Sequence, residues 1–114
     1  MKKSDLTGTW KMSSFNYTLP DGNPDESVKI KNAVRIYNDT HFSVFYEYEN
    51  GKTETCITSY QLDSEKLTLK ILHHTEPGMA DNEFTAITKV SDNKMTHEMN
   101  MDGYQISEVY ERIG

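Results

Sequence analysis

The side chains of this protein that could do chemistry are four histidines, one cysteine and a carboxylate close to the carboxyl end. His73 and His74 are adjacent, so a regular strand points them to opposite faces and they cannot hold one ion together. His97 and Glu108 form the pair that could act as base and acid if a fold enclosed both. No catalytic triad, glycine-rich phosphate loop or metal-ligand motif accompanies them. We therefore expect no enzyme activity, no cofactor and no metal site.

Length and charge narrow the class of protein further. The chain has 114 residues, which suits a single domain over residues 1–114. Its net charge of −6 argues against nucleic acid as a partner and against docking on an anionic membrane. No apolar run approaches the roughly 18–20 residues that a membrane-spanning helix needs. Cys56 is the only cysteine, which excludes an internal disulfide, and its strand-like surroundings favour a small strand residue over a nucleophile.

The amino terminus bears on the compartment. Met1-Lys2-Lys3 resembles the start of a secretory signal, but the residues that follow are polar, where a signal peptide is apolar. As the sequence stands we expect a cytoplasmic protein. A periplasmic or secreted location is the alternative, if a signal peptide has been removed.

The elements that must position these residues are strands. Residues that favour strands (Val, Ile, Thr, Tyr, Phe and Trp) number 36, whereas Ala and Leu together number 9. Turn signals such as Asn50-Gly51 and Asp102-Gly103 separate the strand-like segments at nearly regular intervals. The expected strands are Gly8–Leu19, Val28–Tyr37, Phe42–Glu49, Thr53–Leu62, Leu67–Thr75, Phe84–Ser91, Met95–Met101 and Tyr104–Ile113.

The short connections between these segments predict the topology. Short loops join neighbouring antiparallel strands, which gives an up-and-down order. Eight such strands leave two exposed edges unless the sheet closes on itself. We therefore predict an all-β fold, an eight-stranded antiparallel up-and-down β-barrel.

Two short motifs, at the start and the end of the chain, carry a family resemblance. Leu6-Thr7-Gly8-Thr9-Trp10-Lys11 resembles the Gly-x-Trp opening of the lipocalins and fatty-acid-binding proteins, which form the calycin superfamily. Glu108-Val109-Tyr110-Glu111-Arg112-Ile113 resembles the closing strand of the short lipocalin-like domains. The resemblance implies that Trp10 lies at the closed end of the barrel with Arg112 packed over its indole. A guanidinium on an indole face is favourable by roughly 0.5–2 kcal/mol.

The chain also departs from the larger members of that superfamily. It lacks the disulfide and carboxy-terminal helix of full-length lipocalins and the two-helix lid of fatty-acid-binding proteins. It is most similar to the small bacterial lipocalin-like domains, most of which have no assigned activity. The resemblance thus implies a fold, and the lack of an assigned activity limits what it implies about function.

Alternation predicts which side chains face the interior. In the second strand these are Val28, Ile30, Val34 and Ile36, and in the fifth strand Leu67, Leu69, Ile71 and His73. The third and fourth strands are ambiguous, because apolar residues occur at both parities. The first strand changes parity near Ser13-Ser14, which predicts a β-bulge there.

The last two strands predict a pocket wall. The expected ligand-binding residues are Met95, His97, Met99 and Met101 on one strand and Tyr104, Ile106, Glu108 and Tyr110 on the other. Methionines adapt to irregular ligands, and interior polar tips need partners such as water or ligand. Arg112 is the only interior cation we place, and its stacked position leaves it poorly free to grip a carboxylate. We therefore predict no strong preference for fatty acids over neutral hydrophobic molecules.

Two functions of different classes remain open, because an eight-stranded barrel is either filled by side chains or holds one small ligand. The first is a binding protein for a small hydrophobic or amphipathic molecule. The second is an interaction module with a filled barrel, whose exposed sheet face mediates association, for example as a homodimer. Phe45, Tyr37 and Tyr60 discriminate between them: together on the outside they mark a protein interface, and inside they favour the pocket.

Overall fold

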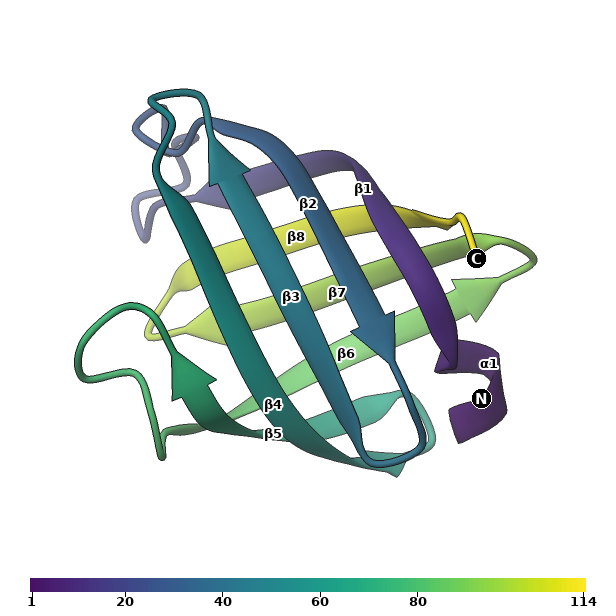
Figure 1. Ribbon diagram of the computed structural model, residues 1–114. Coiled ribbons are helices and arrows are strands. Elements are labelled where there is room, and N and C mark those ends of the chain that lie inside the picture. The colour runs from purple at the N-terminus through teal and green to yellow at the C-terminus, as the bar shows by residue number, and fades with distance from the viewer.

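Segments rich in β-branched and aromatic residues form eight strands in the computed structural model, which describes residues 1–114 (Figure 1). The elements are α1 Lys3–Leu6, β1 Gly8–Thr18, β2 Ile30–Tyr37, β3 His41–Tyr48, β4 Thr53–Asp63, β5 Lys66–His74, β6 Glu83–Ser91, β7 Lys94–Met101 and β8 Tyr104–Arg112. The only helix is four residues long, and no helical segment has the length and apolar character needed to cross a bilayer.

Every strand pairs with the next one along the chain, and β8 pairs with β1 to close the sheet. Closure satisfies the backbone groups of what would otherwise be two sheet edges. The predicted closed, antiparallel, up-and-down barrel is therefore confirmed. The Asp102-Gly103 turn between β7 and β8 has φ of +53° and +88°, the left-handed pair that a tight two-residue hairpin requires.

Three β-bulges interrupt the strand register, and they decide which side chains enter the barrel. The first lies between Met12 and Ser14 on β1, where the parity change predicts it. The other two lie between Ile30 and Asn32 on β2 and beside Ile57–Thr58 where β4 pairs with β5. An extra residue in one strand reverses the faces of everything beyond it.

The bulge in β2 makes part of the predicted interior wrong. Ile30 is buried as expected, but beyond the bulge Val34 and Ile36 face outward, and Ile36 is 54% exposed. Arg35 and Tyr37 take the interior positions instead, with 4% and 2% exposure. Apolar residues do alternate with polar ones along the whole segment. The bulge lies within that segment, however, so the apolar residues before and after it point to opposite faces of the sheet.

The irregular pairing of β4 with β5 causes the second error in the interior assignment. Ile57 is opposite His73, whereas Thr58 is opposite Ile71, so Leu72 is the additional residue. Leu67, Leu69 and Ile71 are buried as predicted. His73 is exposed, and His74 turns toward the inside in its place.

The faces of β3 and β4, which alternation left ambiguous, are also decided. Phe42, Val44, Cys56, Thr58 and Tyr60 are buried, whereas Phe45 and Ile57 are on the outside. Tyr37 and Tyr60 lie inside the barrel, with their ring centroids 5.9 Å apart. Phe45 is outside, so these three aromatic residues do not form one surface patch.

One end of the barrel is closed by the start and the end of the chain, which lie near each other beside α1 in Figure 1. Trp10 is fully buried there and donates its indole N–H to the Leu6 carbonyl at 2.8 Å. The Arg112 guanidinium lies 4.2 Å from the Trp10 ring centroid, the arrangement that the resemblance implies. It also donates to the carbonyls of Thr7 and Asp5 at 2.6 and 2.8 Å, which satisfies the end of α1.

Gly8 explains why glycine precedes Trp10 in the opening motif. Its φ is +133°, and a Cβ there would lie 2.7 Å from both the Arg112 Nη1 and the Gly114 carbonyl oxygen. The glycine thus allows Arg112 and the end of the chain to approach the backbone of β1.

Candidate functional site

A cavity of about 220 Å³ lies inside the barrel, at the end opposite Trp10. The loops around its mouth join β3 to β4 and β5 to β6, on the left of Figure 1. All eight strands contribute side chains to it, and most of them are apolar. The apolar wall includes Phe42, Val44, Ile71, Phe84, Met99 and Ile106.

Seven of the eight predicted ligand-binding residues line the cavity or are buried inside the barrel, at different depths. His97, Met99, Met101 and Ile106 line the cavity. Met95 is fully buried in the core, and Glu108 and Tyr110 are fully buried outside the cavity lining. Tyr104 lies apart from the cavity and donates its hydroxyl to Asp25 Oδ2 at 2.6 Å.

Next to the cavity lies a buried ion pair that alternation did not predict. Arg35 Nη2 is 2.9 Å from Glu108 Oε1, and both side chains are almost completely shielded from water. The Arg35 guanidinium also stacks against aromatic rings, with its Cζ 5.1 Å from the Phe42 centroid and 4.9 Å from that of Tyr110. A paired and hydrogen-bonded charge can remain buried where a lone one could not.

Four tyrosine hydroxyls complete this polar network. Tyr17 donates to Glu108 Oε2 at 2.5 Å, and Tyr46 donates to the same oxygen at 3.0 Å. The Arg35 Nε and Nη1 donate to the hydroxyls of Tyr110 and Tyr37 at 2.9 and 3.1 Å. Burial raises the pKa of Tyr17 and Tyr46 well above the ordinary tyrosine value, so both remain protonated donors.

The placement of Arg35 corrects the prediction that Arg112 is the only interior cation. Arg112 is at the closed end, and Arg35 is the cation that borders the cavity. The predicted interior position of Glu108 is the sequence feature that could have indicated a buried cation, because a buried carboxylate requires a buried partner. Since the charge of Arg35 is already matched by Glu108, its presence does not create an unpaired cation for a fatty acid.

His97 and Glu108 are cross-strand partners, yet they are not arranged as an acid–base pair. Both Glu108 oxygens are bound by Arg35 and tyrosines, and no hydrogen bond joins them to His97. The His97 ring is bonded to Thr88 instead, with Nδ1 3.1 Å from the Thr88 Oγ1. Burial, aided by the Arg35 charge, holds the pKa of His97 well below its usual value, so the ring is neutral.

Cys56 lines the cavity wall without the features of a nucleophile. Its Sγ is 3.2 Å from the Thr58 hydroxyl, and burial raises the pKa of the thiol. A protonated thiol is a poor nucleophile. The residue therefore contributes apolar surface to the wall.

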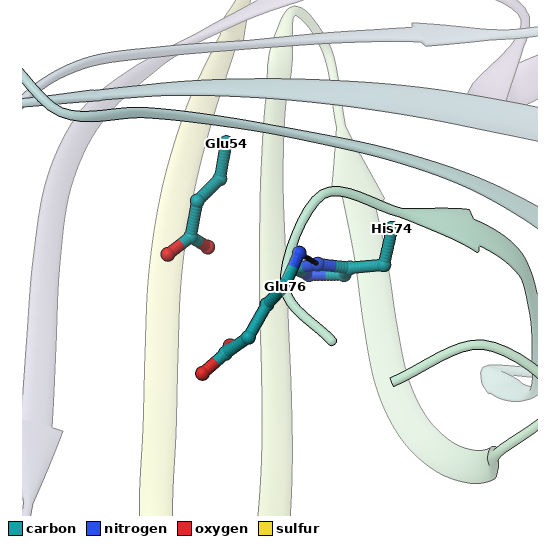
Figure 2. A group of neighbouring side chains, drawn as sticks. All are labelled: Glu54, His74 and Glu76. Carbon is teal, nitrogen blue, oxygen red and sulfur yellow. Dashed lines mark hydrogen bonds between the residues drawn. The ribbon is translucent and has the colours of Figure 1, made fainter. Parts of the chain in front are cut away.

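The cavity mouth carries a cluster of Glu54, His74 and Glu76, whose potential ligand atoms lie within 4.8 Å of one another (Figure 2). The His74 Nδ1 accepts the backbone N–H of Glu76 at 2.8 Å, so in the neutral ring the proton is on Nε2. A cation could bind either nitrogen only after that hydrogen bond or that proton is given up. As folded, the cluster is an acidic, hydrogen-bonded rim.

A small apolar patch lies outside the barrel on β2, β3 and β4. Ile36, Phe45 and Ile57 are 54%, 39% and 45% exposed and surround a shallow depression. Val34 and His73 border the same depression. Val34, Ile36 and His73 were expected inside, and the bulges of β2 and β5 bring them to the surface. The faces of Phe45 and Ile57 were left unassigned.

Comparisons with known proteins agree with this architecture. The sequence model of the lipocalin-like domain matches residues 6–97, which is most of the chain. No curated protein sequence matches significantly. A crystal structure of a lipocalin-like protein from Bacteroides uniformis superposes with a TM-score of 0.60 at 14% identity, covering 96% of this chain and 99% of that chain.

Two further solved structures are similar. An uncharacterized protein from Bacteroides eggerthii has a TM-score of 0.57 at 17% identity, covering 94% of this chain and 98% of that chain. A de novo designed fluorescence-activating β-barrel has a TM-score of 0.55 at 13% identity, covering 99% of this chain and 100% of that chain. At such low identity these likenesses show the fold alone.

Proposed function

The chain belongs to the lipocalin-like domain family, and on that premise we propose that it is a non-enzymatic protein that binds one small hydrophobic or amphipathic molecule inside its barrel. The observation that supports this most is the cavity of about 220 Å³, which has an apolar wall and a few polar groups at its floor and mouth. Ligand pockets have this composition, because apolar burial supplies affinity and sparse polar groups fix orientation.

The size of the cavity limits the ligand. An apolar protein cavity of about 150 Å³ accommodates benzene. A volume of about 220 Å³ is somewhat larger, so the enclosed part of the ligand has on the order of ten non-hydrogen atoms. A long-chain lipid would have to leave most of its chain outside the mouth.

The chemistry of the polar groups supports binding rather than turnover. Glu108 is fully committed to Arg35 and tyrosines, and His97 is neutral and held by Thr88. A general base needs a free lone pair within reach of a substrate proton. Neither the carboxylate nor the Thr88-bound nitrogen offers one.

The proposal can be tested by adding acetophenone and 2-octanone, in separate titrations, to the isotope-labelled protein and following amide signals by NMR. We expect saturable shifts at residues that border the cavity, such as Val44 and Ile71. Met99→Trp fills the cavity and should abolish these shifts. Glu98→Trp introduces the same ring on the outer face of β7 and should preserve them. An absence of saturable shifts with both probes would refute the proposal.

A second candidate function is self-association through the outer patch of Ile36, Phe45 and Ile57, and the exposure of these three apolar side chains favours it. Sedimentation velocity over a concentration series tests it. A dimer that dissociates in Phe45→Ser would support this function, and a monomer at all concentrations would refute it. Ligand binding and association use opposite faces of the sheet, so each can be measured without the other.

A further inference from the structure

His97 has a hydrogen-bonding atom that the protein itself does not use. The side chain is 1% exposed and makes one side-chain hydrogen bond, through Nδ1 to Thr88. Its Nε2 has no partner in the protein. Among side-chain nitrogen and oxygen atoms that are both fully enclosed and without a partner, the structure contains only Asn32 Oδ1. The Nε2 of His97 also has no partner, so it is not fully enclosed. His97 is part of the cavity lining, so the cavity is the side from which a ligand can reach this unpartnered nitrogen.

The contact with Thr88 determines which nitrogen carries the proton. Thr88 is fully buried, and its hydroxyl has no other hydrogen-bond partner than His97 Nδ1. A buried hydroxyl that accepted from Nδ1–H would leave its own hydrogen without an acceptor, which is costly. The hydroxyl therefore donates to a bare Nδ1, and the proton of the neutral ring is on Nε2. His97 thus presents an N–H donor to the cavity.

The other charges around the cavity oppose an anionic ligand. The positive charge of Arg35 is matched by Glu108 at 2.9 Å. At the mouth, Glu54 is paired with Lys52 at 3.7 Å, and Glu76 adds negative charge along the entry path. A carboxylate would lose its hydration inside the barrel and gain no unpaired cation. An uncharged acceptor, such as a carbonyl oxygen, pays a much smaller desolvation cost.

We propose that His97 is the specificity-determining residue of the cavity, and that its Nε2–H selects small hydrophobic molecules that carry an uncharged hydrogen-bond acceptor, typically a ketone, ester or amide carbonyl. This inference rests on the proposed binding function. Thr88 is a positioning residue, because it fixes the tautomer and does not touch the ligand. An apolar ligand of the same shape leaves the buried N–H without a partner, and a site of this kind discriminates against such ligands.

Three probes of nearly identical shape test the inference. Acetophenone has a carbonyl, α-methylstyrene replaces the carbonyl oxygen with a methylene group, and benzoate replaces the methyl group with a second, charged oxygen. We expect acetophenone to bind the wild-type protein about fivefold more tightly than α-methylstyrene, which corresponds to about 1 kcal/mol. Benzoate should bind at least about tenfold more weakly than acetophenone, because its charge must be desolvated.

Variants assign the preference to His97. His97→Phe keeps a planar ring without the donor, and acetophenone should then lose its advantage over α-methylstyrene. His73→Phe changes an exposed imidazole on β5 and should leave the ratio of the two affinities unchanged. If His97→Phe does not fold, the wild-type comparison of the three probes and the spectrum described next still decide the matter.

The tautomer can be read directly from long-range ¹H–¹⁵N spectra of the imidazole, in which the protonated and the bare nitrogen resonate far apart. We expect a protonated Nε2 and a bare Nδ1 in wild type, and a mixture of tautomers in Thr88→Val, which lacks the hydroxyl. A protonated Nδ1 or a charged ring in wild type would overturn the inference.

The binding outcomes separate the two proposals. If all three probes bind with equal affinity, or if benzoate binds most tightly, the inference about His97 is wrong and the binding function stands. If no probe binds, both are wrong. If acetophenone is preferred in wild type and also in His97→Phe, another donor is responsible and the assignment to His97 is overturned.

Discussion

Arg112 at the closed end and Arg35 inside the barrel both lie against aromatic rings, but the partners of their guanidinium groups differ. Arg112 is only partly buried and satisfies its donors with the backbone carbonyls of Thr7 and Asp5. Arg35 is 4% exposed and needs a carboxylate and several tyrosine hydroxyls from other strands. The position of Arg112 therefore depends on the local backbone at the closed end. The burial of Arg35 depends on Glu108, because either charge would be costly to bury without the other.

The largest expected effect is at the closed end. Trp10→Ala removes a fully buried indole and should lower the free energy of unfolding by about 3–5 kcal/mol, as other deletions of core aromatics do. Urea denaturation monitored by far-ultraviolet circular dichroism measures this loss. A loss below about 1 kcal/mol would show that the closed end contributes little to stability.

The interior charge pair gives the next effect. Arg35→Met leaves Glu108 buried without its cation and should cost about 3 kcal/mol or more at neutral pH. The double variant Arg35→Met/Glu108→Leu removes both charges and should be more stable than the single variant, because no unpaired charge remains. Equal stability of the two variants in urea denaturation would contradict the view that the pair acts as a unit.

Gly8 tests the close approach at the closed end. Gly8→Ala adds a Cβ at 2.7 Å from Arg112 and Gly114 at a φ of +133°, and it should cost about 2–3 kcal/mol. Gly51→Ala is the matched control, because Gly51 also has a positive φ, +87°, but open space around it. The difference between their thermal midpoints isolates the contact. If Gly51→Ala is as destabilising, the contact with Arg112 does not matter.

His97 gives the smallest effect, as a dependence of stability on pH. Its folded-state pKa lies well below the unfolded value of about 6.5, so the unfolded chain binds the extra proton first. Above about pH 6.5 the ring is neutral in both the folded and the unfolded state, so the free energy of unfolding does not depend on its protonation. Below about pH 6.5 the unfolded chain takes up the proton, and the free energy of unfolding falls. From pH 6.5 to 5.5 the wild type should lose about 1 kcal/mol more than His97→Gln does. Parallel losses in both proteins would mean that His97 titrates normally in the folded state.

Much of the fold could be predicted from the sequence. The excess of β-branched and aromatic residues, the regular turn signals and the short loops predict eight antiparallel strands in chain order, and these are present. The resemblance of the Gly8–Trp10 motif and of Arg112 to the lipocalin-like families implies the closed end, and the Arg112 guanidinium does lie over the Trp10 indole. Strand alternation also places His97, Met99 and Ile106 on the inside.

The tertiary structure alone decides the faces beyond the bulges. The pattern Val28, Ile30, Val34, Ile36 is uniform in sequence, but the bulge near Asn32 reverses it, so that Arg35 enters the barrel and Ile36 leaves it. The bulge of β1 is visible as a parity change within that strand. The bulge of β2 leaves no such mark in the sequence, because it depends on the curvature that closes the sheet. The pairing of Arg35 with Glu108 and the free Nε2 of His97 follow from that closure. The sequence thus determines the strands and their order, and the closed barrel determines which polar groups meet inside it.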